Sequence, residues 1–274
     1  FQVGSETATV TNTVVGQPIG QFWGYKVIGR FDKPEDFYYK DANGNVKPVA
    51  LPTGCSIGKS GTWLGDYRFA DLNGDGVIDN NDQTFIGNPE PKFTFGFGNT
   101  FSWKGWDLSL QFTGSVGNKV LNYNRRRLEV TGATSNLLTS VLNYAKVEKI
   151  DPNGPDDYRN YYVSNASSTI MPRLYTESYS NGNNRVSDAF VEDGSYLRLQ
   201  NVSLSYTFPK KWIEHIFLSN VKLYMNIQNL FTITKYDGYD PEVGSLWGDA
   251  LKNGIDYNRY PSPRIYTFGI NVSF

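Results

Sequence analysis

The sequence has no long apolar run, almost no thiol or imidazole chemistry, and no excess of either charge. Its 274 residues include one cysteine, one histidine and two methionines, and the formal net charge is −1. No segment approaches the roughly 20 apolar residues of a membrane helix, which excludes a helical membrane protein. Cys55 has no second cysteine for a disulfide, and His215 has no partner at zinc-ligand spacing. The balanced charge argues against nucleic-acid binding.

Aromatic residues are abundant instead, and they follow strand periodicity. Aromatics make up 15% of the chain, with 19 Tyr and 17 Phe. In the stretch 264–274, alternate residues are apolar, while those between them are small or polar. The apolar set is Tyr266, Phe268, Ile270, Val272 and Phe274. A soluble sandwich would bury this face against a second sheet, whereas a membrane barrel would turn it toward lipid.

The same alternation predicts seven strands, and the lengths of their connections favour a barrel. The expected strands are 6–15, 21–31, 92–103, 106–116, 195–208, 221–232 and 264–274. Short turns and long loops alternate strictly between them, as periplasmic turns and extracellular loops do in outer-membrane barrels. This parity places Phe274 at the periplasmic end. Because seven strands are too few to close such a barrel, we expect an all-β, antiparallel transmembrane segment of a larger wall.

The start of the chain, Phe1-Gln2-Val3-Gly4, has neither an initiator Met nor a signal-like apolar region. We therefore expect it to begin within a longer protein or after processing.

Several motifs in order along the chain resemble the C-terminal part of the SusC/RagA family of TonB-linked outer-membrane transporters. They read GQFWGYK at 20–26, GDYRFADLNGDGVI at 65–78, IGNPEPKF at 86–93, GSYLRL at 194–199, NLF at 229–231 and GYDPE at 238–242. The resemblance covers nearly all of residues 1–274. It implies a 22-stranded barrel whose plug domain lies outside this chain.

The resemblance also implies location, partners and cargo. The location would be the outer membrane of a Bacteroidetes-like Gram-negative bacterium, and the plug would couple to the TonB–ExbB–ExbD complex. A SusD-like surface lipoprotein would deliver oligosaccharides or peptides, and no catalysis would be needed. The C-terminal aromatic strand would be the signal read by the barrel-assembly machinery, so deletion of Phe274 is expected to lower the amount of assembled protein.

An acidic loop at 71–82 matches the spacing of a calcium-binding loop. Oxygen ligands fall at positions one, three, five, seven, nine and twelve, with Gly76 at position six. The ligands would be Asp71, Asn73, Asp75, the Val77 carbonyl, Asp79 and Asp82. The flanks do not predict helices, and a metal-free loop of Asx turns is the alternative. We favour structural Ca²⁺, ahead of Mg²⁺, stiffening an extracellular loop.

Other candidate residues keep two interpretations each. Four loop aromatics could stack on sugar rings or on the lid protein, or could simply pack the loop: Tyr236, Tyr239, Trp247 and Tyr257. Arg125, Arg126 and Arg127 could meet lipopolysaccharide phosphates or form solvated ion pairs. Acid pairs such as Asp156-Asp157 lack the apolar surroundings of a glycosidase site. The competing hypothesis for the whole chain is a soluble, calcium-dependent carbohydrate-binding β-sandwich.

Overall fold

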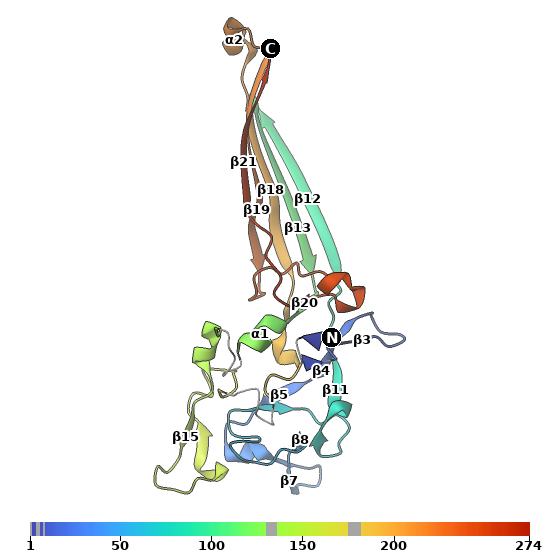
Figure 1. Ribbon diagram of the computed structural model, residues 1–274, viewed down its shortest axis with the longest axis vertical. Coiled ribbons are helices and arrows are strands. Elements are labelled where there is room, and N and C mark those ends of the chain that lie inside the picture. Colours follow the sequence, from blue (N-terminus) through green and yellow to red (C-terminus); the bar gives the residue numbers. More distant parts are fainter. Residues whose placement is uncertain (1, 4–5, 8, 130–135, 175–181) are drawn as a thin grey trace. The chain divides into compact units, whose positions relative to one another are not determined.

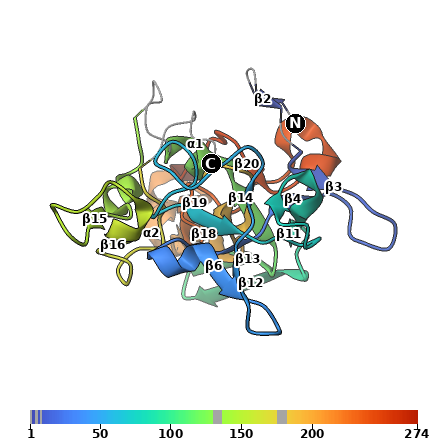
Figure 2. The ribbon, with the colours of Figure 1, turned by 90° about the horizontal axis from the view of Figure 1, so that it is seen from below.

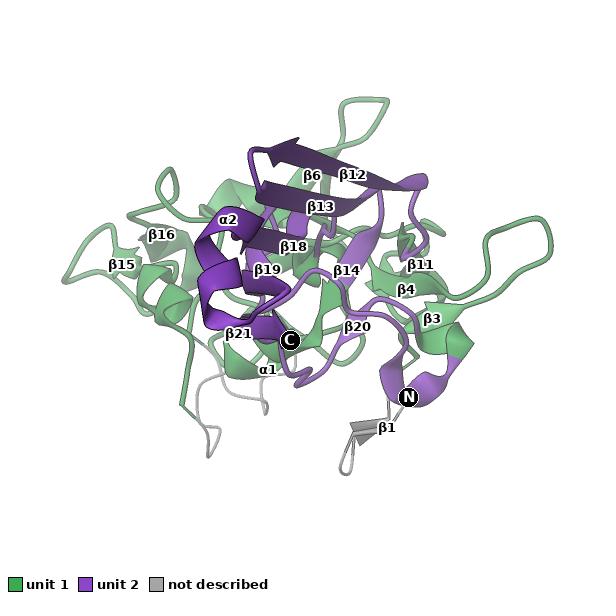
Figure 3. Cartoon of the chain, turned by 90° about the horizontal axis from the view of Figure 1, so that it is seen from above, with its two compact units in different colours: residues 1–88, 121–191, 250–252 green, residues 89–120, 192–249, 253–274 purple. Residues whose placement is uncertain are grey.

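The computed structural model describes residues 2–3, 6–7, 9–129, 136–174 and 182–274, and it divides into two compact units. Unit 1 comprises residues 1–88, 121–191 and 250–252, and unit 2 comprises residues 89–120, 192–249 and 253–274. The chain therefore passes between the units several times (Figure 3).

Unit 2 is built on a five-stranded antiparallel sheet of long strands (Figure 1). In sheet order these are β12 (Phe93–Trp103), β13 (Trp106–Val116), β18 (Tyr196–Thr207), β19 (Asn220–Thr234) and β21 (Ile265–Ser273). The strands contain 9 to 15 residues, enough to cross a bilayer when tilted. The predicted positions of all five are confirmed, with ends that differ by at most two residues.

The turn between β12 and β13 contains only Lys104 and Gly105, both with positive φ. Two left-handed residues in succession make the hairpin turn that matches strand twist. A Cβ on Gly105 would lie 2.6 Å from the Thr207 carbonyl oxygen, so glycine is required here for space as well as for conformation.

Shorter elements complete unit 2. They are α2 (Lys210–Ile213), η6 (Glu214–Ile216), η7 (Leu246–Gly248) and β20 (Ile255–Asp256). The strands β14 (Lys119–Asn122) and β17 (Val191–Asp193) lie where the chain passes between the units, and they form a three-stranded sheet with β20.

Unit 1 consists of short strands and single helical turns (Figure 2). Its strands are β1 (Gln2–Val3), β2 (Glu6–Thr7), β3 (Thr11–Asn12), β4 (Gln21–Tyr25), β5 (Val27–Arg30), β6 (Tyr38–Lys40), β7 (Val46–Pro48), β8 (Leu51–Pro52), β9 (Tyr67–Phe69), β10 (Val77–Ile78), β11 (Gln83–Gly87), β15 (Val147–Lys149) and β16 (Tyr161–Val163). Its helical turns are η1 (Pro34–Phe37), η2 (Asn80–Asp82), α1 (Tyr123–Leu128), η3 (Thr139–Asn143), η4 (Tyr158–Asn160), η5 (Asp188–Phe190) and η8 (Ala250–Lys252).

Among the described residues, two aromatic clusters form part of the core of unit 1. One contains Phe31, Phe37, Trp63, Leu64 and Tyr161, with the rings of Phe31 and Phe37 stacked 4.3 Å apart. The other gathers Tyr25, Tyr67, Phe69 and Ile78. Aromatic burial on this scale supplies most of the hydrophobic stabilisation that such short strands need.

The first two predicted strands form only in pieces and outside the long sheet, and 6–15 contains just β2 and β3, of two residues each. The segment 21–31 divides into β4 and β5, and β4 pairs with β3 and β11 in unit 1. Phe22 and Tyr25, on opposite faces of β4, are both buried. A strand buried on both faces belongs to a packed core, so the observed long sheet has five strands where seven were expected.

Within the described residues, no helix combines the length and apolar character needed to cross a membrane.

Candidate functional site

The long sheet of unit 2 has one apolar face, formed by rows of paired side chains across all five strands. The register places one residue from each strand in each row. One row contains Phe101, Leu108, Leu204, Met225 and Phe268, and the next contains Trp103, Trp106, Tyr206, Leu223 and Ile270. This alignment turns separate amphipathic strands into one continuous apolar surface.

The apolar face is exposed rather than packed against a second sheet. The exposed fractions are 56% for Phe101 and 71% for Phe268. A β-sandwich buries such a face about 10 Å from its partner sheet, so the exposure of this face argues against the competing sandwich hypothesis. A face of this size needs an apolar environment of another kind.

The opposite face carries small and polar residues in equally continuous rows. One row contains Thr100, Ser109, Ser203, Asn226 and Thr267, and a neighbouring row contains Gly98, Gln111, Asn201 and Gln228, with the apolar Ile265 at its end on β21. The Thr100 hydroxyl donates to the Ser109 hydroxyl across the first hairpin at 3.2 Å. An apolar outer face opposite a polar inner face is the pattern of a barrel with an aqueous lumen.

A β-bulge at Gln200 changes which side chains of β18 reach each face. Gln111 pairs with Asn201, but the next residue, Phe112, pairs with Leu199. The extra residue keeps Leu199 on the apolar face and turns Arg198 to the polar face, where it pairs with Thr113. The sequence does carry a sign of this bulge, because the apolar residues of β18 change from odd-numbered positions at Leu199 to even-numbered positions at Val202. The strand predicted at 195–208 did not include a bulge.

Arg198 uses the position created by the bulge to hold the loop that follows β19. Its guanidinium forms ion pairs with Asp240 and with Glu242, the latter at 2.9 Å, and donates to the Thr232 hydroxyl at 3.0 Å. The Arg198 side chain is only 5% exposed. This cluster joins two of the family-like motifs, GSYLRL and GYDPE, which lie about 40 residues apart.

Opposing effects set the pKa of Asp240. Burial raises this pKa. Hydrogen bonds from the Glu242 and Ser262 amides and from Arg198 lower it by more, so the net pKa lies below the ordinary value. Its contribution to loop stability is therefore present above the pKa of an unfolded aspartate. That contribution is lost only when the pH falls through the lowered folded pKa.

The four loop aromatics differ in their exposure. Tyr236 is buried with Val120 and Val243, and its hydroxyl donates to the buried Asp256 carboxylate. The Tyr236 ring is therefore packed inside unit 2, and the role of the loop aromatics in stacking stays a prediction. Tyr239 and Trp247 are exposed, at 81% and 66%. Tyr257 meets Trp247 edge to face at 6.5 Å.

The acidic loop of unit 1 is ordered by its own side chains. Asp71 accepts hydrogen bonds from the amides of Gly74 and Gly76 at 2.7 and 2.9 Å. The buried Asp82 accepts from the amides of Leu72 and Asp79, both at 2.8 Å, and so closes the loop. Between these two residues, Asn73, Asp75 and Asp79 each accept from the amide two residues on, which makes the Asx turns of the metal-free alternative.

The chemistry of this donor set remains compatible with a cation, although the loop geometry alone does not assemble a site. Among the described residues, no three His, Cys, Asp or Glu side chains gather closely enough to hold a metal ion. Each carboxylate oxygen has two lone pairs, however, so one amide bond leaves a second available. Gly76 has φ +86°, the left-handed turn expected at position six.

A second motif-derived residue, Asp66, lies at the centre of a buried network in unit 1. Arg173 binds it in two-pronged geometry, with Nε 2.7 Å from Oδ1 and Nη2 3.0 Å from Oδ2. The Asn183 side chain and the Trp63 amide donate to the same carboxylate. Burial raises the pKa of Asp66, and these donors act against that increase.

Gly65 makes room for this network. Its φ is +85°, and a Cβ there would lie 2.8 Å from the Cβ of Arg173. The Gly-Asp pair of the motif therefore combines a left-handed backbone with close approach of a buried arginine.

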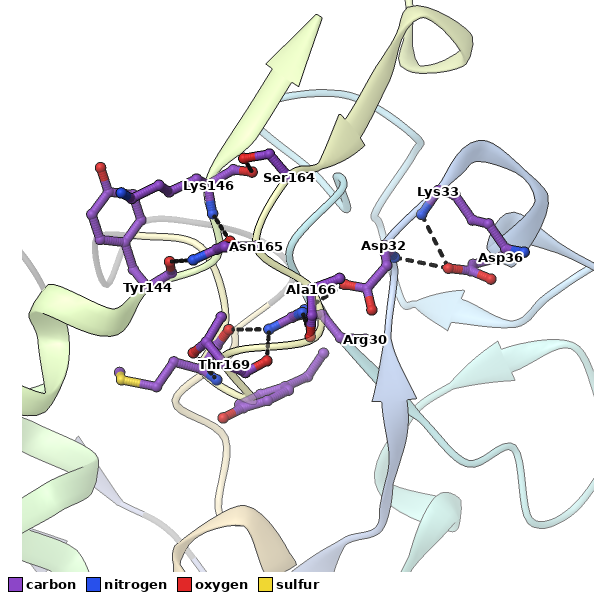
Figure 4. A network of polar contacts seen from close by, with 12 residues as sticks. Arg30, Asp32, Lys33, Asp36, Tyr144, Lys146, Ser164, Asn165, Ala166 and Thr169 are labelled. Carbon is purple, nitrogen blue, oxygen red and sulfur yellow. Dashed lines mark hydrogen bonds and ion pairs between the residues drawn. The ribbon is translucent and has the colours of Figure 1, made fainter. Parts of the chain in front are cut away.

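Arg30 holds a distant segment of unit 1 in a similar way (Figure 4). Its Nη1 donates to the carbonyls of Thr169 and Met171 at 2.8 and 2.7 Å, and its Nε pairs with Asp32. Asp36 accepts from the Asp32 amide at the start of η1. The segment that follows β16 is thereby tied to the end of β5.

Arg125 and Arg126, which follow β14, make contacts within unit 1. Arg126 is buried, donates to the Asn184 carbonyl and to the Tyr123 hydroxyl, and lies over the Tyr123 ring. Arg125 pairs with Glu129 at 3.2 Å. These contacts favour the ion-pair interpretation over a lipopolysaccharide site.

Phe274 is 92% exposed, next to the end of β21. Its carbonyl accepts a hydrogen bond from the Ser219 hydroxyl at 3.2 Å. An exposed terminal ring is available for recognition, and its assembly role stays a prediction.

Known proteins similar to this chain are TonB-dependent receptors. TonB-dependent receptor P3 of Formosa agariphila is 32% identical over 263 residues, which cover 94% of this chain and 22% of the receptor. TonB-dependent receptor SusC of Bacteroides thetaiotaomicron is 27% identical over 210 residues, covering 76% and 18%. The chain thus spans about a quarter or less of the length of these relatives. No family model matches it.

Solved structures agree on the fold. The RagAB peptide importer in its open-open state contains a chain that superposes on all of this chain with a TM-score of 0.61 at 22% identity, over 24% of its own length. A second RagAB peptide transporter structure covers 93% of this chain with a TM-score of 0.59 at 23% identity, over 23% of its own length. The likeness confirms the barrel-type fold. The relatives are receptors rather than enzymes, as expected from the sequence.

Proposed function

We propose that this chain, a homologue of one segment of the SusC-like TonB-dependent receptors, forms part of the wall and surface loops of an outer-membrane nutrient importer. The observation that carries the proposal is the long sheet of unit 2, apolar on one face and polar on the other. Its apolar rows would contact lipid, and its polar rows would line the lumen.

The edges of the sheet support a larger barrel. Within the part of the chain that the structure describes, β12 and β21 each have a neighbouring strand on one side only. Unpaired backbone groups in lipid cost several kcal/mol each, so further strands of the same wall would complete the pairing. The chain would be the C-terminal portion of that barrel, with the plug encoded outside it.

Partners and cargo follow from homology and chemistry together. The plug would couple import to the TonB–ExbB–ExbD complex, and a SusD-like lipoprotein would cover the extracellular side. The cargo would be oligosaccharides or peptides, and the exposed Tyr239 and Trp247 would contact cargo or lid. The solved neighbours at low identity are described as peptide transporters.

The proposal is tested on the full-length protein that contains this sequence. We expect it to fractionate with the outer membrane, to require detergent for extraction, and to migrate differently on gels before and after boiling, as closed barrels do. A protein that stays soluble and monomeric without detergent contradicts the proposal.

We also propose that the loop at 71–82 binds structural Ca²⁺ through Asp71, Asn73, Asp75, Val77, Asp79 and Asp82. The ligand spacing and the left-handed Gly76 support this. At a free concentration about 100 times Kd, Ca²⁺ should add about 2.7 kcal/mol to local stability.

The measurement is the melting temperature of the full-length protein in Ca²⁺ and in chelator. Ca²⁺ should raise it for the wild type and not for Asp75→Ala, which removes the ligand oxygen. The matched control is Asp41→Ala, which should keep the Ca²⁺ shift and alters another Asx-turn loop, where Asp41 accepts from the amides of Asn43 and Asn45. No shift of the wild type at millimolar Ca²⁺ would contradict binding.

A further inference from the structure

A ladder of aromatic rings runs along the short-turn end of the unit 2 sheet. Trp103 and Trp106 pair across the hairpin turn. Ring centroids then lie 4.7 Å apart between Trp106 and Tyr206, 5.0 Å between Tyr206 and Phe208, and 6.4 Å between Phe208 and Trp212. The ladder thus links the hairpin to the connector that carries α2, and α2 lies at the end of the sheet opposite β20 (Figure 1). Trp103 and Trp212 are exposed.

Three exposed lysines lie just beyond this ladder. Lys104 is the first residue of the hairpin turn, and its Nζ lies 4.9 Å from the centroid of the Trp103 ring. Lys210 and Lys211 begin α2, directly before Trp212. Across the described residues, none of the three ammonium groups is within ion-pairing distance of a carboxylate.

The acidic groups at this end do not cancel the charge. Asp107 is on the polar face, where it accepts from the Ser102 hydroxyl at 2.6 Å and pairs with Lys222 at 3.8 Å. Glu214 follows Ile213 in the connector, next to His215. The ladder is therefore bordered by more positive than negative charge.

We propose that this end of the sheet binds the headgroups of anionic phospholipids in the periplasmic leaflet. The inference rests on the proposed membrane-spanning function. Indole and phenol rings favour the level of the bilayer interface, where their apolar bodies contact acyl chains and their polar edges meet water. Lysines one turn beyond such rings lie at the level of lipid phosphates.

The position of the aromatic ladder favours a lipid over a soluble acidic protein as the partner of the three lysines. Trp103, Trp106 and Tyr206 belong to the apolar face, so whatever meets the lysines also meets the border of that face. A bilayer presents hydrocarbon and phosphate in that order, whereas an acidic protein surface does not. Lipopolysaccharide phosphates would lie at the opposite end of the strands, where the long loops are.

The experiment uses the full-length protein in nanodiscs of phosphatidylcholine that contain a minor fraction of phosphatidylglycerol. Lipids retained after mild detergent extraction are quantified by mass spectrometry. The test variant is Lys104→Gln/Lys210→Gln/Lys211→Gln. The matched control changes three lysines of unit 1 and the same total charge: Lys26→Gln/Lys33→Gln/Lys40→Gln.

The wild type and the control should retain phosphatidylglycerol in excess over its bulk fraction. Each lysine should contribute about fivefold to this preference at low ionic strength, and salt should weaken it. The test variant should lose most of the excess while keeping wild-type heat-modifiable migration, which shows that it is folded.

Two results overturn the inference without touching the proposed function. One is a membrane-inserted wild type with no preference for phosphatidylglycerol. The other is an equal loss of preference in the test and control variants. A wild type that fails to insert at all would instead overturn the proposed function.

Discussion

A Val202→Arg substitution should remove most of the assembled protein from the outer membrane, whereas Ser203→Arg should leave it largely intact. Val202 lies near the middle of β18 on the apolar face, between Leu110 and Ile227. Arginine facing lipid near the bilayer midplane costs about 2–4 kcal/mol. Ser203 is the adjacent residue on the polar face, between Ser109 and Asn226, where an arginine would face the polar lumen instead of lipid.

Comparing Val202→Arg with Ser203→Arg tests the effect of the face to which the arginine side chain points. Both variants add the same residue to the same strand, so differences in expression or strand propensity largely cancel. The measurement is the heat-modifiable fraction in outer membranes, followed by urea unfolding of the reconstituted protein. Equal behaviour of the two variants would contradict the assignment of the faces.

An Arg173→Met substitution should destabilise unit 1 by about 3–5 kcal/mol, because it leaves the fully buried Asp66 carboxylate without its cation. Methionine keeps most of the side-chain volume, so the effect is electrostatic rather than a cavity. Asn183 and the Trp63 amide would remain as donors, but neither carries charge. Hydrogen exchange of the β9 amides measures the expected loss of local stability.

A surface ion pair provides the control for this prediction. Arg159 pairs with Asp157 at 2.7 Å, but its side chain is 74% exposed. Arg159→Met should therefore change stability by less than about 1 kcal/mol. If Arg173→Met were equally mild, the network around Asp66 would not hold unit 1 together. The double variant Asp66→Leu/Arg173→Met should recover part of the loss, since both charges are then absent.

The sequence was most informative about the long strands. In 92–103 and 106–116, apolar and small residues alternate over the full length, and the side-chain period of two fixes both the strand and its faces. The same pattern could not say which sheet a strand joins. The Thr and Val alternation at 6–15 suits any pleated surface, and only β2 and β3, of two residues each, form there in unit 1.

Contacts between distant residues were beyond local patterns. Asp66 and Arg173 are 107 residues apart, and Arg198 and Asp240 are 42 apart. A lone charged residue in a loop reads as solvated until the fold buries it. The family-like motifs did contain three of these residues. Their physical role, a buried cation joining two segments, became visible only in the structure.

The order of strands in the sheet has a consequence for how quickly the wall can form. The β12–β13 pair needs only a two-residue turn, but nearly 80 residues separate β13 from β18. Loop closure costs about 0.6 kcal/mol for each doubling of length, so joining β13 to β18 costs roughly 3 kcal/mol more than closing the hairpin. Two hairpins, β12–β13 and β18–β19, should therefore form early. The pairing of β13 with β18, which joins the two hairpins, should be the slow step.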